Sequence, residues 1–204
     1  MDLALPHSDD ELLRLVIAGN EDAFAALYRK RHGAVYRFAL QMSGSPAIAE
    51  DVTQEVFLVL IREARSYDSS RGSLSAFLYG IARNYVLRYL KRDRAYVSMA
   101  EDAEETTESA TGQLVAQQDP LGDLTRNETI EAVRQAVLAL PPHYREVVVL
   151  CDLHETSYTE AAGILGCAVG TIRSRLHRGR GILVEKLRAV DATPDRSESV
   201  RCFM

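Results

Sequence analysis

The fold of this chain is best predicted from residues 157–190, which read SYTEAAGILGCAVGTIRSRLHRGRGILVEKLRAV. Ser157 and Glu160 have the S-x-x-E spacing of a capping box, so a short helix should begin there. Gly166 can end that helix in the left-handed conformation. A longer helix should follow, because apolar side chains recur at three- and four-residue steps from Val169 to Leu187. The segment therefore predicts a helix-turn-helix.

The outer face of the second predicted helix is basic, with four arginines within residues 173–180. Such a helix, braced by a shorter one, suits the major groove of DNA, where arginine can bond a guanine edge with two hydrogen bonds. An amphipathic surface helix with a solvated basic face is the alternative. Gly179 and Gly181 are unfavourable here, since each costs the helix roughly 1 kcal/mol relative to alanine. The basic face carries Thr171, Arg173, Ser174, Arg175, His177, Arg178 and Arg180.

The composition narrows the class of protein. A chain of 204 residues allows one domain or two small ones, and no apolar run is long enough for a membrane span. The N-terminus lacks the basic-then-apolar order of a signal peptide, so we expect a cytoplasmic protein without membrane insertion. Three cysteines (Cys151, Cys167 and Cys202) form no disulfide framework. Cys151 and His154 have a spacing that zinc could use, but a small apolar residue would serve at each cysteine, so we expect no metal.

The net charge is −5, and the acidity is concentrated in one segment. Residues 98–127 hold one base and seven acids, whereas residues 171–188 hold six bases and one acid. Residues 97–122 also have few large apolar side chains, so burial cannot offset the entropy lost on ordering. We therefore predict a flexible acidic linker over 97–122, between an N-terminal domain (1–96) and a helix-turn-helix domain (123–190). Residues 191–204 should be a flexible tail.

Local start and stop signals predict helices in the rest of the chain. Asparagine or serine caps precede three apolar-periodic stretches in the N-terminal part, and glycine follows the first two. No segment alternates like a strand over more than a few residues. The fold should therefore be all-α, with two small helical domains, the second built of four helices. The helices predicted before the helix-turn-helix cover residues 8–19, 20–44, 45–67, 73–94, 124–140 and 143–153.

Two of these helices carry surfaces that can be interpreted in two ways. The third has a mixed polar and apolar outer face, of a kind that is usually only solvated. The second half of the fourth interleaves basic and aromatic residues, which suits unwound nucleic acid because charges hold phosphate and rings stack on bases. Aromatic rings in the core and a solvated basic helix end are the alternative. The first face comprises Asp51, Gln54, Glu55, Leu58 and Arg62, and the second comprises Arg83, Asn84, Arg88, Tyr89, Lys91, Arg92 and Arg94.

No catalytic constellation is recognisable in the sequence. The chain lacks a Gly-rich phosphate loop, a G-x-S-x-G elbow and an H-E-x-x-H pair. We therefore name no catalytic residue and expect neither an enzyme nor a bound cofactor.

Taken in order, the motifs resemble a bacterial RNA polymerase sigma factor of the extracytoplasmic-function (ECF) type. AEDVTQEVF (49–57) is similar to the core-binding helix of that family, and RGSLSAFLYGIARNYVLRYLKR (71–92) is similar to its promoter-melting region. LPPHYREVVVL (140–150) and SYTEAAGILGCAVGTIRSRLHRGR (157–180) resemble its second domain. The likeness covers nearly all of residues 8–190, and the ordered set is more specific than a helix-turn-helix alone.

The resemblance implies a role for each surface. Five residues would face the clamp coiled coil of the polymerase's largest subunit: Asp51, Gln54, Glu55, Leu58 and Arg62. The loop from Tyr67 to Ser75, with Ser69, Ser70 and Arg71, would select the minus-ten element. Near it, Asn84 would adjoin the pocket for a flipped base. The DNA backbone would be held by Arg83, Arg88, Lys91 and Arg92. The minus-thirty-five element would be read by Arg173, Ser174, His177 and Arg178, with Thr171 and Arg175 on phosphate.

The same resemblance implies the function and the partners. The protein would bind core RNA polymerase and promoter DNA, melt the DNA without chemistry of its own, and be a monomer when free. Its acidic linker would run through the basic RNA and template channel of the polymerase, and an anti-sigma factor would be a further partner.

Two other functions remain alternatives. The first is a dimeric helix-turn-helix repressor or activator on duplex DNA, which leaves the 51–62 face and the acidic linker unexplained. The second is a nucleic-acid enzyme, for which paired carboxylates, metal ligands and a nucleophile are missing.

Overall fold

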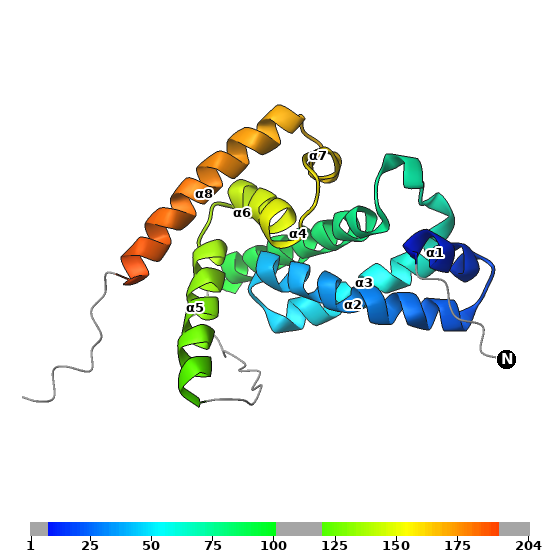
Figure 1. Ribbon diagram of the computed structural model, residues 1–204, viewed down its shortest axis with the longest axis horizontal. Helices are drawn as coiled ribbons and strands as arrows, with labels where there is room; N and C mark the ends of the chain where they lie inside the picture. The colour runs from blue at the N-terminus through cyan, green and yellow to red at the C-terminus, as the bar shows by residue number, and fades with distance from the viewer. Residues whose placement is uncertain (1–7, 101–119, 192–204) are drawn as a thin grey trace, which may run out of the picture.

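The computed structural model describes residues 8–100 and 120–191, and every regular element in these ranges is helical, as predicted (Figure 1). The central part of the predicted linker (101–119) and nearly all of the predicted tail (192–204, with Cys202) lie outside the described residues. None of the helices described is both long enough and apolar enough to cross a membrane.

Three N-terminal helices begin at residues that the sequence marks as caps. Asn20 accepts a hydrogen bond from the Ala23 N–H at 2.9 Å at the start of α2 (Glu21–Ser43). Ser8 and Ser45 cap α1 (Asp9–Ile17) and α3 (Pro46–Glu63) in the same way. Gly44 ends α2 at a φ of 75°, a left-handed conformation that favours glycine. These local predictions are confirmed.

Two N-terminal helix ends differ from the prediction. α3 stops at Glu63, and a 3₁₀ turn (Ala64–Ser66) carries the chain on to Tyr67. α4 (Leu74–Ala100) continues past Arg94 into the first residues of the predicted linker. Neither glycine nor proline occurs between Arg94 and Ala100, so no local signal ends the helix earlier.

The C-terminal part consists of four helices, as predicted: α5 (Pro120–Leu138), α6 (Pro142–Val148), α7 (Tyr158–Leu165) and α8 (Val169–Asp191). α5 begins inside the predicted linker, and a π-helical turn (Val149–Leu153) replaces the predicted end of α6. Ser157 and Glu160 form both hydrogen bonds of the capping box, and Gly166 is left-handed at a φ of 62°. The helix-turn-helix of α7 and α8 is therefore confirmed.

Buried apolar side chains hold each part together. Leu27, Phe38 and Leu78 have no exposed surface and join α2 to α4, with α3 packed against both. In the C-terminal part, Ile172 and Leu176 of α8 are buried against α6. Burying one such side chain contributes roughly 1.5–3 kcal/mol.

The two parts also pack against each other, which the sequence did not indicate. Figure 1 shows α7 over the first half of α4, and α5 lies against α2. The contact with α5 is close, because a Cβ atom at Gly44 would lie 3.1 Å from the Leu138 Cδ1 atom. Buried residues of both parts belong to one continuous cluster.

Gly179 lies where α8 crosses α6. A Cβ atom at this position would lie 3.0 Å from the Val148 Cγ2 atom and 3.4 Å from the Tyr144 Cβ atom. A Cβ atom at Gly181 would meet nothing within 4 Å. The close packing of α6 and α8 therefore explains one of the two unfavourable glycines and gives no account of the other.

Candidate nucleic-acid interface

An exposed face of α3 carries the residues predicted to bind polymerase. Leu58 is 52% exposed although it is a large apolar residue. Ile61, which the sequence analysis did not select, is 53% exposed and lies three residues further along the same helix face. Large exposed apolar side chains beside charged ones are typical of protein contact sites. We call this face the α3 surface, and it comprises Asp51, Gln54, Glu55, Leu58, Ile61 and Arg62.

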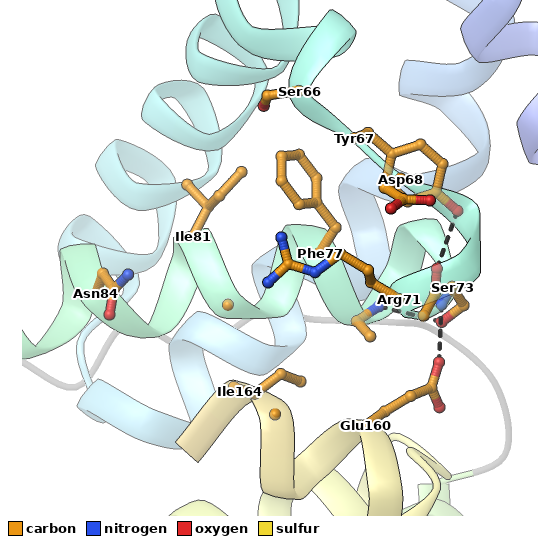
Figure 2. Close-up of a pocket in the computed structure, with 14 residues that line it drawn as sticks. Ser66, Tyr67, Asp68, Arg71, Ser73, Phe77, Ile81, Asn84, Glu160 and Ile164 are labelled. Carbon is orange, nitrogen blue, oxygen red and sulfur yellow. Dashed lines mark hydrogen bonds between the residues drawn. The ribbon is translucent and has the colours of Figure 1, made fainter. Parts of the chain in front are cut away.

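A cavity of about 370 Å³ lies between the loop before α4, the first half of α4 and α7 (Figure 2). Three of the predicted minus-ten residues line it: Tyr67, Arg71 and Asn84. Phe77 and Ile81 give it an apolar wall. Phe77 was not predicted, although its seven-residue spacing from Asn84 puts both on one face of α4. The α7 side of the cavity is formed by Glu160, Gly163 and Ile164.

The loop beside this cavity is shaped by hydrogen bonds of its own. Asp68 accepts from the Ser70 N–H at 2.9 Å and from the Ser70 hydroxyl at 2.7 Å, at the start of a 3₁₀ turn (Ser69–Arg71). These two hydrogen bonds lower the pKa of Asp68. Ser69, Ser70 and Arg71 are exposed. The predicted promoter-selecting side chains are therefore accessible on a folded loop.

The basic half of α4 combines the two interpretations of its sequence. Tyr85 and Tyr89 are half-buried and pack against the core, as the structural alternative expected. The guanidinium groups of Arg88 and Arg92 lie over these rings, 5.0 and 4.7 Å from the ring centroids. Arg88, Lys91 and Arg92 remain exposed and could still contact phosphate. Arg83 does not join this group, because it points to the C-terminal part.

Three of the polar contacts between the two parts involve residues of α6 and α7. Arg83 pairs with Glu146 of α6 at 2.8 Å. Arg145 donates to the Met42 carbonyl at 2.9 Å, at the C-terminal end of α2, where a cation is favourable and no basic residue of α2 lies. Glu160 accepts from the Ser73 N–H at 2.9 Å beside the start of α4. The N-terminal part thus receives contacts from both α6 and α7.

Glu160 serves two helices at once. Its Oε2 atom completes the capping box of α7, and its Oε1 atom accepts from Ser73. Burial alone would raise the pKa of Glu160, but the hydrogen bonds from Ser73 and Ser157 outweigh burial and lower the pKa to about 2. The residue predicted only as a cap is therefore also part of the contact between the two parts.

His154 lies in the same contact. Its Nδ1 atom is 3.0 Å from the Tyr79 hydroxyl, and its Nε2 atom is 2.8 Å from Gln41 Oε1. A neutral ring satisfies both partners if Nε2 donates to Gln41 and Nδ1 accepts from Tyr79. Burial, and secondly the charge of Arg37, lower the pKa of His154 to about 4. No group of three or more His, Cys, Asp or Glu residues that could hold a metal occurs in the described ranges.

The predicted reading face of α8 remains open. Arg173, Ser174, His177 and Arg178 are exposed, and Thr171 and Arg175 are half-buried. Arg180 turns back to Asp152, with hydrogen bonds of 3.0 and 2.6 Å. In this arrangement the face predicted to read duplex DNA is accessible, while α7 covers one side of the cavity.

The sequence matches two protein-family models, Sigma-70 region 2 over residues 27–96 and Sigma-70, region 4 over residues 130–183. ECF RNA polymerase sigma factor SigW of Bacillus subtilis is 34% identical over 181 residues, covering 86% of this chain and 95% of SigW. ECF RNA polymerase sigma factor SigM of Mycobacterium tuberculosis is 33% identical, covering 88% of this chain and 85% of SigM.

A solved structure has the same fold. The sigma factor RpoE of Bartonella quintana, solved in complex with the anti-sigma factor NepR, is 27% identical. Its TM-score is 0.64, with 81% of this chain and 96% of the RpoE chain covered. The match to region 2 contains the α3 surface and most of the residues that line the cavity. The match to region 4 contains the open face of α8. The chain therefore belongs to the ECF family of RNA polymerase sigma factors.

Proposed function

We propose that this ECF sigma factor binds core RNA polymerase through the α3 surface. The observation that carries the assignment is the exposure of Leu58 and Ile61, at 52% and 53%, within a charged face of a helix that is otherwise packed in the core. An interface that buries apolar side chains at its centre and keeps charged ones at its rim would use this face without rearranging the fold. The proposed polymerase-binding domain comprises residues 1–96.

The cavity beside the loop is the proposed minus-ten site. A flipped base could enter between the loop and α4, where Phe77 offers a ring for stacking and Asn84 offers a hydrogen-bonding amide. The exposed serines Ser69 and Ser70, with Arg71, are the proposed selecting residues. The basic residues Arg83, Arg88, Lys91 and Arg92 would hold the backbone of the unwound strand.

The open face of α8 is the proposed minus-thirty-five site, in a domain over residues 123–190. Arginine side chains on an exposed helix can reach guanine edges in the major groove, and this face has two that no described contact ties down, Arg173 and Arg178. Ser174 and His177 lie between them as further donors or acceptors. Thr171 and Arg175, which are half-buried, would position the helix on phosphate.

The proposed sites cannot all be used in the packed arrangement. Arg83 is held in an ion pair with Glu146, and α7 forms one side of the cavity that an unwound strand would enter. We therefore infer that the two parts separate when promoter DNA is bound. Since RpoE was solved with an anti-sigma factor, we propose a partner of the same class for this chain.

The protein itself would carry out no chemistry. A sigma factor supplies recognition and strand separation, while the polymerase forms the bonds. We propose that it acts in the cytoplasm as a monomer until it meets polymerase.

Run-off transcription from a library of promoter fragments tests the proposal. Core bacterial polymerase is used alone and with this protein, and protein-dependent transcripts with defined start sites are the expected result. They would also reveal the promoter sequence. A stable dimer that binds duplex DNA tightly and yields no transcript would instead identify a helix-turn-helix repressor.

A further inference from the structure

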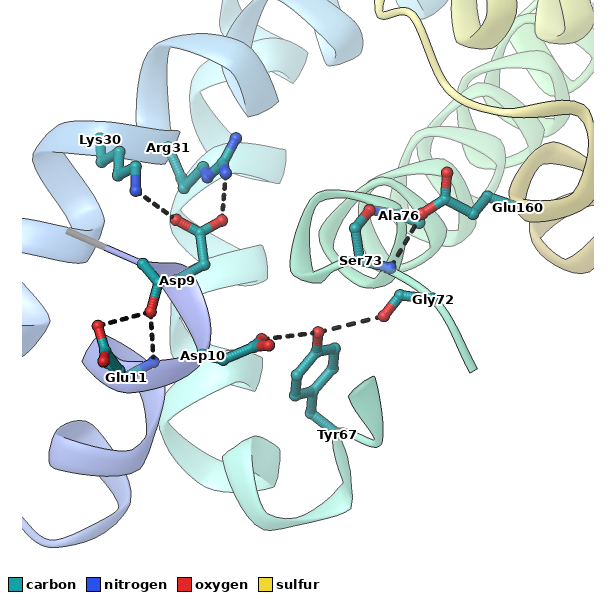
Figure 3. A network of polar contacts seen from close by, with 11 residues as sticks. Asp9, Asp10, Glu11, Lys30, Arg31, Tyr67, Gly72, Ser73, Ala76 and Glu160 are labelled. Carbon is teal, nitrogen blue, oxygen red and sulfur yellow. Dashed lines mark hydrogen bonds and ion pairs between the residues drawn. The ribbon is translucent and has the colours of Figure 1, made fainter. Parts of the chain in front are cut away.

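Tyr67 closes the loop that precedes α4. Its hydroxyl lies 3.1 Å from the Gly72 carbonyl oxygen, at the other end of the loop, and 3.1 Å from Asp10 Oδ1 on α1. Figure 3 shows Asp10, the Tyr67 hydroxyl and Gly72 in one line across the base of the loop. The Tyr67 ring is held separately, edge to face with Phe77 at 5.6 Å between centroids. The hydroxyl of Tyr67 is thus turned towards the protein.

The Tyr67 hydroxyl shares its hydrogen bond between Asp10 and the Gly72 carbonyl. One proton serves two acceptors, and both distances exceed the usual 2.7–2.8 Å of an O–H···O hydrogen bond. Burial, and then the hydrogen bond to Asp10, raise the pKa of Tyr67 to about 12. The group therefore remains protonated, and able to donate, throughout the neutral range.

Asp10 belongs to a helix that is itself firmly anchored. Its neighbour Asp9 forms ion pairs with Lys30, at 2.8 Å, and with Arg31, both on α2. Leu12 and Leu13 bury the other side of α1, with 3% and 2% of their surfaces exposed. α1 lies before residue 27, where the match to Sigma-70 region 2 begins. A residue outside the matched region thus contacts the loop proposed to select the minus-ten element.

Gly72 supplies the conformation that the contact needs. Its φ of 152° lies in a region that L side chains rarely adopt, and this orients the carbonyl at the end of the 3₁₀ turn (Ser69–Arg71). The contact between the Tyr67 hydroxyl and the Gly72 carbonyl therefore joins the two ends of the loop, in addition to the hydrogen bonds between Asp68 and Ser70 within it.

We propose that Asp10 and Tyr67 are positioning residues that hold the minus-ten loop in its reading conformation through the Asp10–Tyr67–Gly72 hydrogen bonds, which we call the clasp. A loop that is already ordered loses less entropy when it binds a strand, so it binds more tightly and discriminates better. This inference rests on the proposed function of the loop. It makes α1 part of promoter selection.

The test compares Tyr67→Phe, Asp10→Ala, Asp10→Asn and the double variant Asp10→Ala with Tyr67→Phe, each reconstituted with core polymerase. The template is the library fragment on which the wild-type protein starts transcripts, together with versions changed at each minus-ten position. Phenylalanine keeps the ring contact with Phe77 and removes only the hydroxyl. Asparagine keeps an acceptor oxygen at position 10. Glu21→Ala is the matched control, since it removes an exposed first-turn acid from the neighbouring helix α2.

Tyr67→Phe and Asp10→Ala should each reduce transcription from the preferred minus-ten sequence about two- to twelvefold, the usual effect of one hydrogen bond. They should reduce the ratio of preferred to altered sequences as well. The double variant should lose little more than either single one, because both act through the same contact. Asp10→Asn and Glu21→Ala should retain the wild-type ratio, and polymerase affinity should not change in any variant.

The proposal is overturned if Tyr67→Phe and Asp10→Ala keep the wild-type ratio, or if their effects simply add. A uniform loss on all templates, accompanied by weaker polymerase binding, would show a purely structural role and also overturn it. If the wild-type protein yields no transcripts at all, the proposed function of the loop fails first, and the two failures are thereby distinguished.

Discussion

The guanidinium of Arg83 is bound to the carboxylate of Glu146, with Nε and Nη2 both 2.8 Å from Oε1. The two residues are 63 positions apart, and the Glu146 side chain is only 10% exposed. Arg83 was predicted to hold DNA backbone, and in the packed arrangement a glutamate of the other part occupies it. The contact between the two parts therefore competes with one of the proposed DNA contacts.

Glu146→Gln should weaken this contact and release Arg83. A hydrogen bond to a charged group contributes roughly 1.5–3 kcal/mol, so the free energy of unfolding in urea should fall by about that amount. Binding of a minus-ten single strand to the free protein, measured by fluorescence anisotropy, should become tighter. Glu131→Gln is the control, because Glu131 and Arg134 form an exposed pair on α5 whose loss should cost at most about 0.5 kcal/mol. Unchanged affinity for the strand would show that Glu146 does not compete with DNA.

Acid should loosen the contact around His154. Its pKa is lowered to about 4 by burial and the charge of Arg37, whereas an unfolded histidine titrates near 6.5. The unfolded chain therefore binds more protons between these values, so stability is complete above pH 6.5 and declines as the pH falls towards 4. The loss should reach roughly 3 kcal/mol at most.

Urea unfolding at pH 7 and pH 4.5 measures this loss, and Glu160, whose pKa is about 2, titrates mainly below this interval. Each variant is compared with itself at the two pH values, so the effect of the substitution on the free energy of unfolding at pH 7 cancels. His154→Gln should reduce the pH dependence, and the exposed His143→Gln should leave it unchanged. Equal pH dependence in all three proteins would be evidence against His154 as the titrating group.

Gly179→Ala and Gly181→Ala should differ in their effects on stability. Alanine improves the propensity of a helix by roughly 1 kcal/mol at either site. At residue 179 the new Cβ atom would lie 3.0 Å from Val148, and such overpacking costs roughly 1–3 kcal/mol. Thermal unfolding should therefore show Gly181→Ala stabilised and Gly179→Ala neutral to destabilised by about 2 kcal/mol. Stabilisation by both substitutions would mean that α6 and α8 can move apart at little cost.

Arg173→Ala and Arg178→Ala should each weaken discrimination at the minus-thirty-five element by roughly 1–3 kcal/mol, the usual contribution of a bidentate arginine to one base pair. Polymerase affinity should stay the same, because α8 is far from the α3 surface in the fold (Figure 1). Competition binding of matched and altered duplexes by the reconstituted holoenzyme measures the effect. Loss of polymerase binding in either variant would contradict the proposed division between the two domains.

Gln54→Ala combined with Glu55→Ala should do the reverse. It should weaken binding to core polymerase and leave duplex binding by the free protein unchanged, since these side chains lie on the α3 surface. Ile61→Ala should weaken polymerase binding further, because Ile61 is one of the two large apolar side chains exposed there. Pull-down with core polymerase at several salt concentrations provides the measurement. Wild-type affinity in the double variant would remove this face from the proposal.

The sequence alone determined the helices, their caps and the order of the proposed surfaces. Asn20, Ser45, Ser157 and Gly166 act within one turn of the chain, so the residues that decide each helix end lie next to one another in the sequence. The α3 surface and the open face of α8 follow from helical periodicity in the same way. The π-helical turn after α6 and the length of α4 carried no such local signal.

Only the tertiary structure decided which side chains of distant segments meet. Tyr67 and Asp10 are 57 positions apart, and His154 lies 113 positions from Gln41. No periodicity or cap relates such pairs, because their contacts depend on how whole helices pack. Packing also brought Gly179 close to Val148, placed Phe77 in the cavity and turned the Tyr67 hydroxyl inward. Local chemistry in the sequence thus determined the elements of this sigma factor, and close packing between them decided which groups are free to meet DNA.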